Sequence, residues 1–216
     1  MRLSETPRTR LTRHAERAGV EPEDLYAVLD AGLVGHLGLA RDGVPVVLPM
    51  GYGRSGSTLY LHGSSGAGWG RLLDGESICF TVTHLDGVVY ARSVFDHSLN
   101  YRSAVVFGVA RLVDDADEKW LGLEVVTEQL SPGSWSYARL PTKRELAATV
   151  VFALDLTEAS VKIRNGPPSD EPEDVATGGR WAGVLPLTTV LGMPETGPDV
   201  EPGVVVPPHV LNRHLR

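Results

Sequence analysis

The sequence consists largely of short runs of β-branched and aliphatic residues, most of them followed by a turn that contains glycine. This pattern predicts antiparallel strands, because a hairpin reverses the chain within about two to five residues whereas neighbouring parallel strands need a long crossover. The Asp-Gly pair at residues 42–43 is typical of such a hairpin turn. Seven strands are expected, at residues 34–40, 44–50, 58–62, 77–83, 88–93, 104–113 and 150–163.

The spacing of these strands favours a closed antiparallel barrel with helices on its outside. The first three strands are expected to form a meander with a turn at residues 53–56, and residues 84–87 are expected to join the fourth and fifth strands. With 24 glycines and 15 prolines in 216 residues, the chain favours many short elements over a helical bundle. Three helices are expected, at residues 22–32, 115–130 (the longest) and 142–148.

Charge and cysteine content limit the kinds of partner and cellular location that we expect for this protein. Lys and Arg number 20 and Asp and Glu 27, so the net charge is −7 and the surface repels a nucleic-acid backbone. Cys79, the single cysteine, lies in an apolar run and is expected to be a small core residue. No run approaches the ~20 apolar residues of a membrane span, and no signal peptide is apparent. We therefore expect no nucleic-acid or membrane partner and a cytoplasmic location.

The first candidate site is the polar, glycine-containing segment His62-Gly63-Ser64-Ser65 after the third expected strand. Such a segment offers backbone N–H groups and hydroxyls to a phosphate, and a flexible surface loop is the alternative interpretation. Its spacing matches neither a Walker loop nor a dinucleotide fingerprint, and Ala67 argues against a serine-hydrolase elbow. The histidines lack metal-ligand spacing, so no metal site is expected.

The second candidate site is the polar run at residues 97–103, His-Ser-Leu-Asn-Tyr-Arg-Ser, which leads into the expected strand at residues 104–113. Its Arg, Tyr and His side chains suit an anionic ligand or a partner subunit. A solvated loop whose Asn and Ser cap turns is the alternative. Catalytic roles are not assigned; the candidates are His62, Tyr101 and Arg102.

At these motifs the sequence resembles the pyridoxamine 5′-phosphate oxidase-like, FMN-binding split-barrel proteins, and among them the branch that includes nitroimidazole-resistance proteins. The resemblance covers roughly residues 7–190. The His-Gly-Ser and Asn-Tyr-Arg-Ser motifs, in this order and on the expected strands, are its most specific part. The matching segments are 43–45 with 48–50, 59–64, 81–83 with 85–87, 98–103 with 106–108, 118–119, 142–146, 162–164 and 181–186.

The resemblance implies a mainly β fold, a six- to seven-stranded antiparallel split β-barrel with peripheral helices. It implies a homodimer that holds flavin mononucleotide (FMN) in two clefts at the dimer interface. The implied parts are an N-terminal arm (1–20), an FMN-binding split-barrel domain (21–164) and a C-terminal extension (165–216) that packs on the barrel or the dimer partner. The implied cofactor-binding residues are Pro49, Met50, His62, Gly63, Ser64, Ser65, Arg71, Tyr101, Arg102, Ser103 and Trp181.

One position departs from the family pattern. Relatives usually carry a basic residue about six positions after the histidine, where this sequence has Gly68, and Arg71 is the nearest substitute for pairing with the flavin phosphate. A charge-assisted phosphate contact contributes ~1.5–3 kcal/mol. If Arg71 does not replace the missing cation, FMN is expected to bind weakly or to be absent.

The leading functional hypothesis is a flavin-dependent oxidoreductase that acts on an unidentified small molecule, with a reduced nicotinamide or deazaflavin as a possible electron source. The alternatives are a non-catalytic flavin- or haem-binding protein and an empty dimeric scaffold, because a fold does not fix a function. Absorbance of the purified protein distinguishes these hypotheses, since bound flavin absorbs blue light, haem gives a Soret band and an empty scaffold gives neither.

Overall fold

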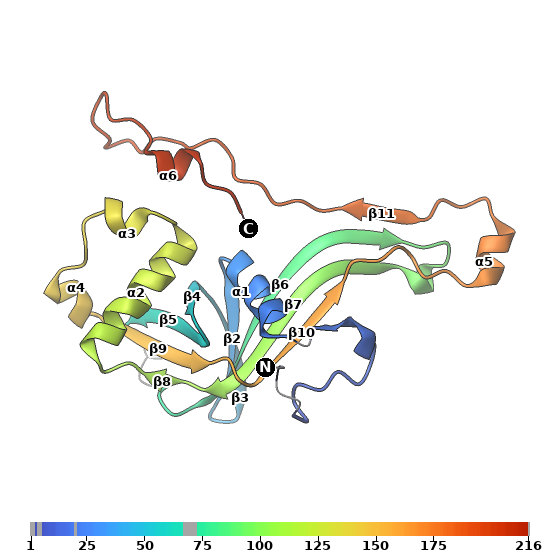
Figure 1. Ribbon diagram of the computed structural model, residues 1–216, viewed down its shortest axis with the longest axis horizontal. Helices are drawn as coiled ribbons and strands as arrows, with labels where there is room; N and C mark the ends of the chain where they lie inside the picture. Colours follow the sequence, from blue (N-terminus) through green and yellow to red (C-terminus); the bar gives the residue numbers. More distant parts are fainter. Residues whose placement is uncertain (1–2, 4–5, 20, 67–72, 216) are drawn as a thin grey trace. The chain divides into compact units, whose positions relative to one another are not determined.

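The structure is a computed structural model that describes residues 3, 6–19, 21–66 and 73–215. The chain forms two compact units, each built from three segments, whose elements are labelled in Figure 1. Unit 1 consists of Met1–Gly32, Thr81–Val106 and Glu158–Thr189, and unit 2 of Leu33–Phe80, Phe107–Thr157 and Val190–Arg216. Strands β6 and β7 contribute residues to both units.

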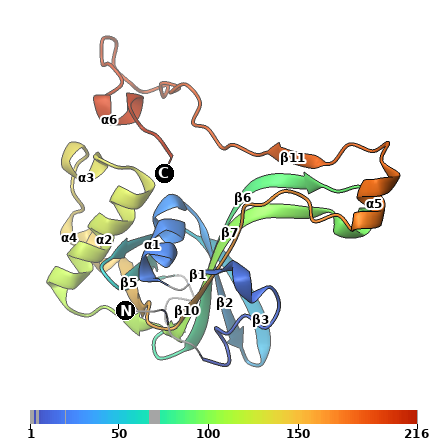
Figure 2. The same ribbon diagram turned by 45° about the vertical axis from the view of Figure 1, so that its right-hand side comes forward.

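Unit 1 is built on antiparallel strands. Strand β10 pairs with β1 on one side and with β7 on the other, and β11 pairs with the C-terminal end of β6. Both views show β11 running along β6, with α5 close to the ends of β6 and β7 (Figure 1 and Figure 2). Its elements are η1 (Ala15–Arg17), β1 (Ala18–Gly19), α1 (Pro22–Ala31), β6 (Ser77–Tyr90), η2 (Val94–Asp96), β7 (Ser98–Val109), β10 (Ala159–Arg164), α5 (Pro172–Thr177) and β11 (Gly183–Pro186).

Unit 2 contains the β2–β3 hairpin and a four-stranded antiparallel sheet in the order β4-β5-β9-β8. Helix α2 packs against β4, β5 and β9. The elements of unit 2 are β2 (Gly35–Arg41), β3 (Val44–Met50), β4 (Tyr52–Ser55), β5 (Thr58–Ser64), β8 (Arg111–Leu112), α2 (Ala116–Leu130), α3 (Ser134–Tyr137), α4 (Lys143–Ala147), β9 (Thr149–Asp155) and α6 (Pro208–Leu211).

The interior of unit 2 is apolar and closely packed. The rings of Tyr52 and Phe80 meet edge to face with 5.1 Å between their centroids. At Gly53 of β4, an added Cβ would lie 2.5 Å from the backbone carbonyl oxygen of Val125 in α2. Glycine at this position therefore permits backbone contact between β4 and α2. The fully buried larger side chains of this unit include Tyr52, Leu59, Leu61, Leu73, Phe80, Phe152 and Leu154.

The predicted antiparallel, mainly β architecture is confirmed, and so are the three predicted helices. Helix α2 is the longest helix of the described residues, and Asp115 caps it by accepting a 2.8 Å hydrogen bond from the N–H of Glu118. The hairpin turn between β2 and β3 has positive φ at both Asp42 and Gly43, as an Asp-Gly hairpin requires. No helix in the described part of the chain is long and apolar enough to cross a membrane.

The predicted three-stranded meander is wrong. Residues 53–56 are not a turn, because Tyr52–Ser55 forms β4, and the chain reverses at Gly56 and Ser57 instead. Strand β5 pairs with β4 and β9, in a different sheet from β2 and β3. Gly53 suggested a turn, but its function is the close approach of α2.

Other predicted strand boundaries are also wrong. Residues 84–87 continue β6 rather than turning, because Gly87 pairs with Pro186 of β11. The polar run at residues 97–103 belongs mostly to β7, which begins at Ser98. The predicted strand 150–163 divides into β9 and β10, which lie in different sheets, and the predicted strand 104–113 divides into β7 and β8. The predicted strands 77–83 and 88–93 fall mostly in the single strand β6. With β1, β4 and β11, which were not predicted, the described residues form eleven strands rather than seven.

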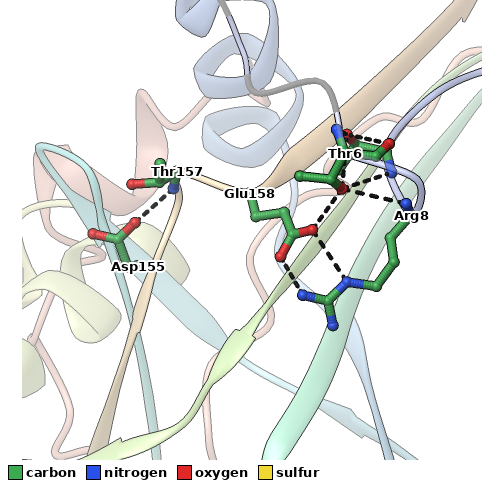
Figure 3. Close-up of polar contacts among 6 residues, drawn as sticks. Thr6, Arg8, Asp155, Thr157 and Glu158 are labelled. Atoms are coloured by element: carbon green, nitrogen blue, oxygen red, sulfur yellow. Dashed lines mark hydrogen bonds and ion pairs between the residues drawn. The ribbon is translucent and has the colours of Figure 1, made fainter.

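The break between β9 and β10 is stabilised by polar contacts. Asp155 accepts a 2.7 Å hydrogen bond from the N–H of Thr157 (Figure 3). In unit 1, Glu158 accepts hydrogen bonds of 2.6 Å from Thr6 Oγ1 and 3.1 Å from Arg8 Nε, and forms an ion pair with Arg8. Arg8 first, and then Thr6, lower the pKa of Glu158. The N-terminal segment is thus attached next to the start of β10.

Candidate functional site

Unit 2 contains a pocket of about 310 Å³ beside β5 and β9. Helices α2, α3 and α4, which lie near these strands in Figure 1, supply the rest of its wall together with the segment between α3 and α4. The wall is largely apolar, with one imidazole and one ion pair. The lining residues are His62, Leu123, Thr127, Ser134, Trp135, Ala138, Arg139, Leu140, Pro141, Glu145, Leu146 and Thr149.

Helix α3 is held against α2 by Glu128. The Oε2 atom of Glu128 accepts a 2.7 Å hydrogen bond from the N–H of Gly133, and its Oε1 atom accepts a 2.8 Å bond from the N–H of Trp135. Gly133 has a φ of 84°, a left-handed conformation that favours glycine and lets α3 start just after α2 ends. Trp135 packs edge to face on Trp120 of α2, with 5.2 Å between ring centroids. These contacts fix Trp135 in the pocket wall.

At the start of α4, Arg139 and Glu145 form a bidentate ion pair. Nη1 and Nη2 of Arg139 donate hydrogen bonds of 3.0 and 2.8 Å to Oε2 and Oε1 of Glu145. Thr142 and Glu145 form a capping box, in which Glu145 Oε2 accepts a 2.7 Å bond from the N–H of Thr142. Arg139 first, and then Thr142, lower the pKa of Glu145 to about 2. The pair therefore stays charged at neutral and mildly acidic pH.

His62 lies on β5 opposite Val151 of β9, lines the pocket and is also exposed to solvent. Burial by the surrounding groups lowers the pKa of His62 below its ordinary value of 6.5, and no hydrogen bond joins its ring to another described residue. At neutral pH the imidazole is therefore uncharged. One of its ring nitrogens then carries a lone pair that can bind a metal ion or accept a proton.

The predicted segment after His62 continues β5 to its end. Gly63 and Ser64 pair with β9, and Ser65 donates its backbone N–H to the carbonyl oxygen of Ala148 at 2.9 Å. The segment therefore lies next to α4 and the pocket wall. Arg71 lies outside the described residues, so its expected contact with a flavin phosphate stays a prediction.

Pro49 and Met50 lie at the end of β3, the last strand in the order of its sheet. Pro49 is exposed and Met50 is half-buried, while Val47 on the same strand is 63% exposed. An edge strand of this kind presents apolar side chains together with backbone hydrogen-bonding groups. These are the features that a planar heterocycle needs for contact.

The other predicted site residues lie in unit 1. Tyr101, Arg102 and Ser103 are on β7, where each pairs in register with β10. Arg102 donates hydrogen bonds of 3.0 and 2.9 Å to the two carboxylate oxygens of Asp86, so its charge is already balanced within this unit. Trp181, just before β11, is 69% exposed.

Sequence reasoning missed most of the pocket. It placed a helix end and a short helix between residues 130 and 148, but assigned no binding role to Trp135, Arg139 or Glu145. One signal was present, because Trp135 stands in a short segment of serine, glycine and proline where no strand or helix pattern explains a large apolar side chain. A tryptophan in such a segment indicates that its side chain packs in an apolar pocket or core.

Residues 21–163 match the pyridoxamine 5′-phosphate oxidase family. The flavocytochrome Anf3 from Azotobacter vinelandii is 37% identical, with a TM-score of 0.91 and 98% of each chain covered. The FAD- and haem-binding protein from Mycobacterium smegmatis is 42% identical, with a TM-score of 0.86 over 90% of this chain and 95% of that chain. The chain therefore belongs to the pyridoxamine 5′-phosphate oxidase-like family of split-barrel proteins.

A candidate 5-nitroimidazole antibiotic resistance protein from Bacteroides thetaiotaomicron shares the fold at 17% identity and a TM-score of 0.55, over 68% of this chain and 86% of that chain. No curated protein matches the sequence. These comparisons confirm the family and the split-barrel fold class predicted from the motifs.

Proposed function

We propose that this protein is an oxidoreductase that binds a flavin and a haem, with the haem in the pocket of unit 2 and His62 as a ligand to its iron. The observation that carries this proposal is the position of His62, whose imidazole bonds to no other described residue and lines a largely apolar pocket. Two relatives, a flavocytochrome and a FAD- and haem-binding protein, support it.

The pocket residues fit a haem. Leu123, Trp135, Leu140 and Leu146 supply apolar surface of the kind that a porphyrin ring needs. Histidine is a common haem ligand, and only the uncharged ring binds a metal ion, so the lowered pKa of His62 favours ligation. A volume of 310 Å³ lies at the lower end of the range for ligand sites, about 300–1,000 Å³.

The flavin is proposed to contact β3 at Pro49 and Met50 and the segment Gly63, Ser64 and Ser65. The edge of β3 offers apolar surface and backbone groups to the ring, and the end of β5 offers the hydroxyl groups of Ser64 and Ser65 to the phosphate. When bound, a flavin exchanges two electrons as hydride with a small molecule and haem iron exchanges single electrons. The further candidates for contact with the flavin are Arg71, Tyr101, Arg102, Ser103 and Trp181.

The family resemblance favours FMN, whereas one of the two similar proteins binds FAD. Acid release of the flavin followed by chromatography distinguishes the two nucleotides. Recovery of FMN supports the prediction made from the motifs, and recovery of FAD overturns it without affecting the haem site.

A homodimer is also proposed. Unit 1 exposes Val94 and Phe95 at η2, which are 87% and 90% accessible, in addition to Trp181. Val94 and Phe95 are adjacent in η2, and neighbouring exposed apolar side chains are typical of an interaction surface. Sedimentation equilibrium is expected to give twice the chain mass of 23.2 kDa, and a mass of 23.2 kDa at micromolar concentration would exclude the dimer.

The haem assignment is tested by the absorbance spectra of the full-length wild type, His62→Ala and His36→Ala. We expect a Soret band and flavin bands in the wild type. Loss of the iron ligand in His62→Ala is expected to weaken haem binding at least about tenfold and to leave the flavin in place. His36, exposed on β2 outside the pocket lining, is the matched control. A wild type without a Soret band, or an unchanged band in His62→Ala, contradicts the assignment.

A further inference from the structure

We propose that Arg139 makes the pocket specific for a porphyrin that carries carboxylates, by donating hydrogen bonds to a propionate group. This inference rests on the proposed haem site and assigns a function to a residue of its rim. Iron protoporphyrin has an apolar ring and two anionic propionates, so a site that encloses the ring needs a polar partner where the propionates leave it.

The charges of the pocket are concentrated at one place. Arg139 and Glu145 are the charged residues among those that line the pocket. The other lining side chains, apart from His62, are apolar or carry hydroxyls. The side chain of Arg139 is 66% exposed and that of Glu145 49%. Arg139 therefore meets both the pocket and the solvent, which is where a propionate of an enclosed porphyrin would lie.

Hydrogen bonds hold the guanidinium of Arg139 in one orientation and leave some of its N–H groups unused. Nη1 donates to the carbonyl oxygen of Leu140 at 2.9 Å and to Glu145 at 3.0 Å, and Nη2 donates to Glu145 at 2.8 Å. These bonds use three of the five N–H groups of an arginine. The Nε–H and one Nη2–H have no acceptor among the described residues, so they remain for a ligand.

Glu145 has two opposing effects on this function. Its bidentate bond orients Arg139, and its anchoring to Thr142 in the capping box fixes that orientation to α4. Its negative charge also repels a second carboxylate at the same guanidinium. Arg139 and Glu145 are therefore expected to change porphyrin affinity in opposite directions, and only for a porphyrin that carries free carboxylates.

The test is a Soret titration of the full-length apoprotein with iron protoporphyrin IX and, separately, with its dimethyl ester, which lacks the two charges. Arg139→Gln is expected to weaken binding of the free acid by about three- to tenfold and to leave the ester unchanged. Arg139→Lys keeps the charge without the planar fork and is expected to fall between wild type and Arg139→Gln. Glu145→Gln retains a capping side chain and is expected to strengthen binding of the free acid only.

Arg144→Gln is the matched control, because it removes the same charge from an exposed position on α4 that does not line the pocket. Equal losses for the free acid and the ester in Arg139→Gln, or the same loss in Arg144→Gln, would overturn this inference while the haem site stands. A wild type that binds neither porphyrin would instead overturn the proposed function, and this inference with it.

Discussion

In unit 1 the polar side chains of β7 bond to neighbouring segments, whereas in unit 2 His62 on β5 faces a pocket and bonds to no other described residue. Asn100 accepts a hydrogen bond from Arg164, and Arg102 pairs with Asp86. His97, just before β7, accepts a 3.1 Å bond from the N–H of Ala91. Both regions contain a histidine and an arginine, and in the second region His62 and Arg139 line a pocket.

The bonding partners of a polar side chain separate residues with a structural role from residues that are available to a ligand. A polar group that bonds to a neighbouring strand contributes to folding. A polar group on a cavity wall without a protein partner is available to a ligand. The comparison therefore predicts stability effects for the first region and binding effects for the second.

The largest effect is expected from Arg164, which is 7% exposed and donates to Asn100, to Gly166 O at 3.2 Å and to Pro167 O at 3.0 Å. Arg164→Ala leaves these acceptors without their donor, so we expect a loss of about 2–4 kcal/mol in the free energy of unfolding. Urea denaturation measures it, and haem titration of the folded fraction is expected to give the wild-type affinity. A stability loss below about 0.5 kcal/mol would contradict the structural function of this residue.

A smaller loss is expected from Gly53→Ala in unit 2. The added Cβ meets the backbone of α2 at Val125, which cannot move as a flexible side chain does, and we expect a cost of about 1–3 kcal/mol. Because α2 carries Leu123 of the pocket wall, haem affinity should fall as well. Gly166→Ala, where an added Cβ has no neighbour within 4 Å, is the control. An unchanged stability of Gly53→Ala would rule out the tight β4–α2 contact.

The smallest effect concerns pH. His62 has its pKa lowered by burial in the folded state, so between that value and the ordinary 6.5 the unfolded chain binds more protons than the folded one. The free energy of unfolding should therefore rise with pH through this window and become level above 6.5. His62→Gln should remove that part of the slope, as measured by urea denaturation of the apoprotein from pH 5 to pH 7.5. The Arg139–Glu145 pair does not contribute there, since the pKa of Glu145 is about 2. An identical slope in both proteins would show that His62 titrates normally.

Local signals in the sequence predicted much of the fold. The Asp-Gly turn at residues 42–43 and the helices expected at residues 115–130 and 142–148 depend on short-range features, and each is present. The errors concern strand pairing, which depends on residues far apart in the chain. Gly87 and Gly53 suggested turns, but one pairs with β11 and the other admits α2.

The candidate site was predictable only in part. His62 was found because it begins a polar, glycine-containing segment that also belongs to a family motif, but its pocket depends on three helices whose packing no local pattern specifies. Glu128 attaches α3 to α2 through the backbone N–H groups of Gly133 and Trp135. The spacing of these three residues in the sequence does not predict this contact. Arg139 was missed for the same reason, because its importance follows from the pocket that it lines rather than from its neighbours in the sequence.

Chemical rescue is the sharpest test of whether His62 ligates haem iron in the pocket of unit 2. His62→Gly removes the imidazole and leaves space for an added one, while the other lining residues stay unchanged. We predict that this variant loses the Soret spectrum of the wild type and that millimolar imidazole restores it, whereas pyrrole, which has no basic ring nitrogen, does not. A His62→Gly variant that keeps the wild-type Soret spectrum without imidazole would contradict the claim.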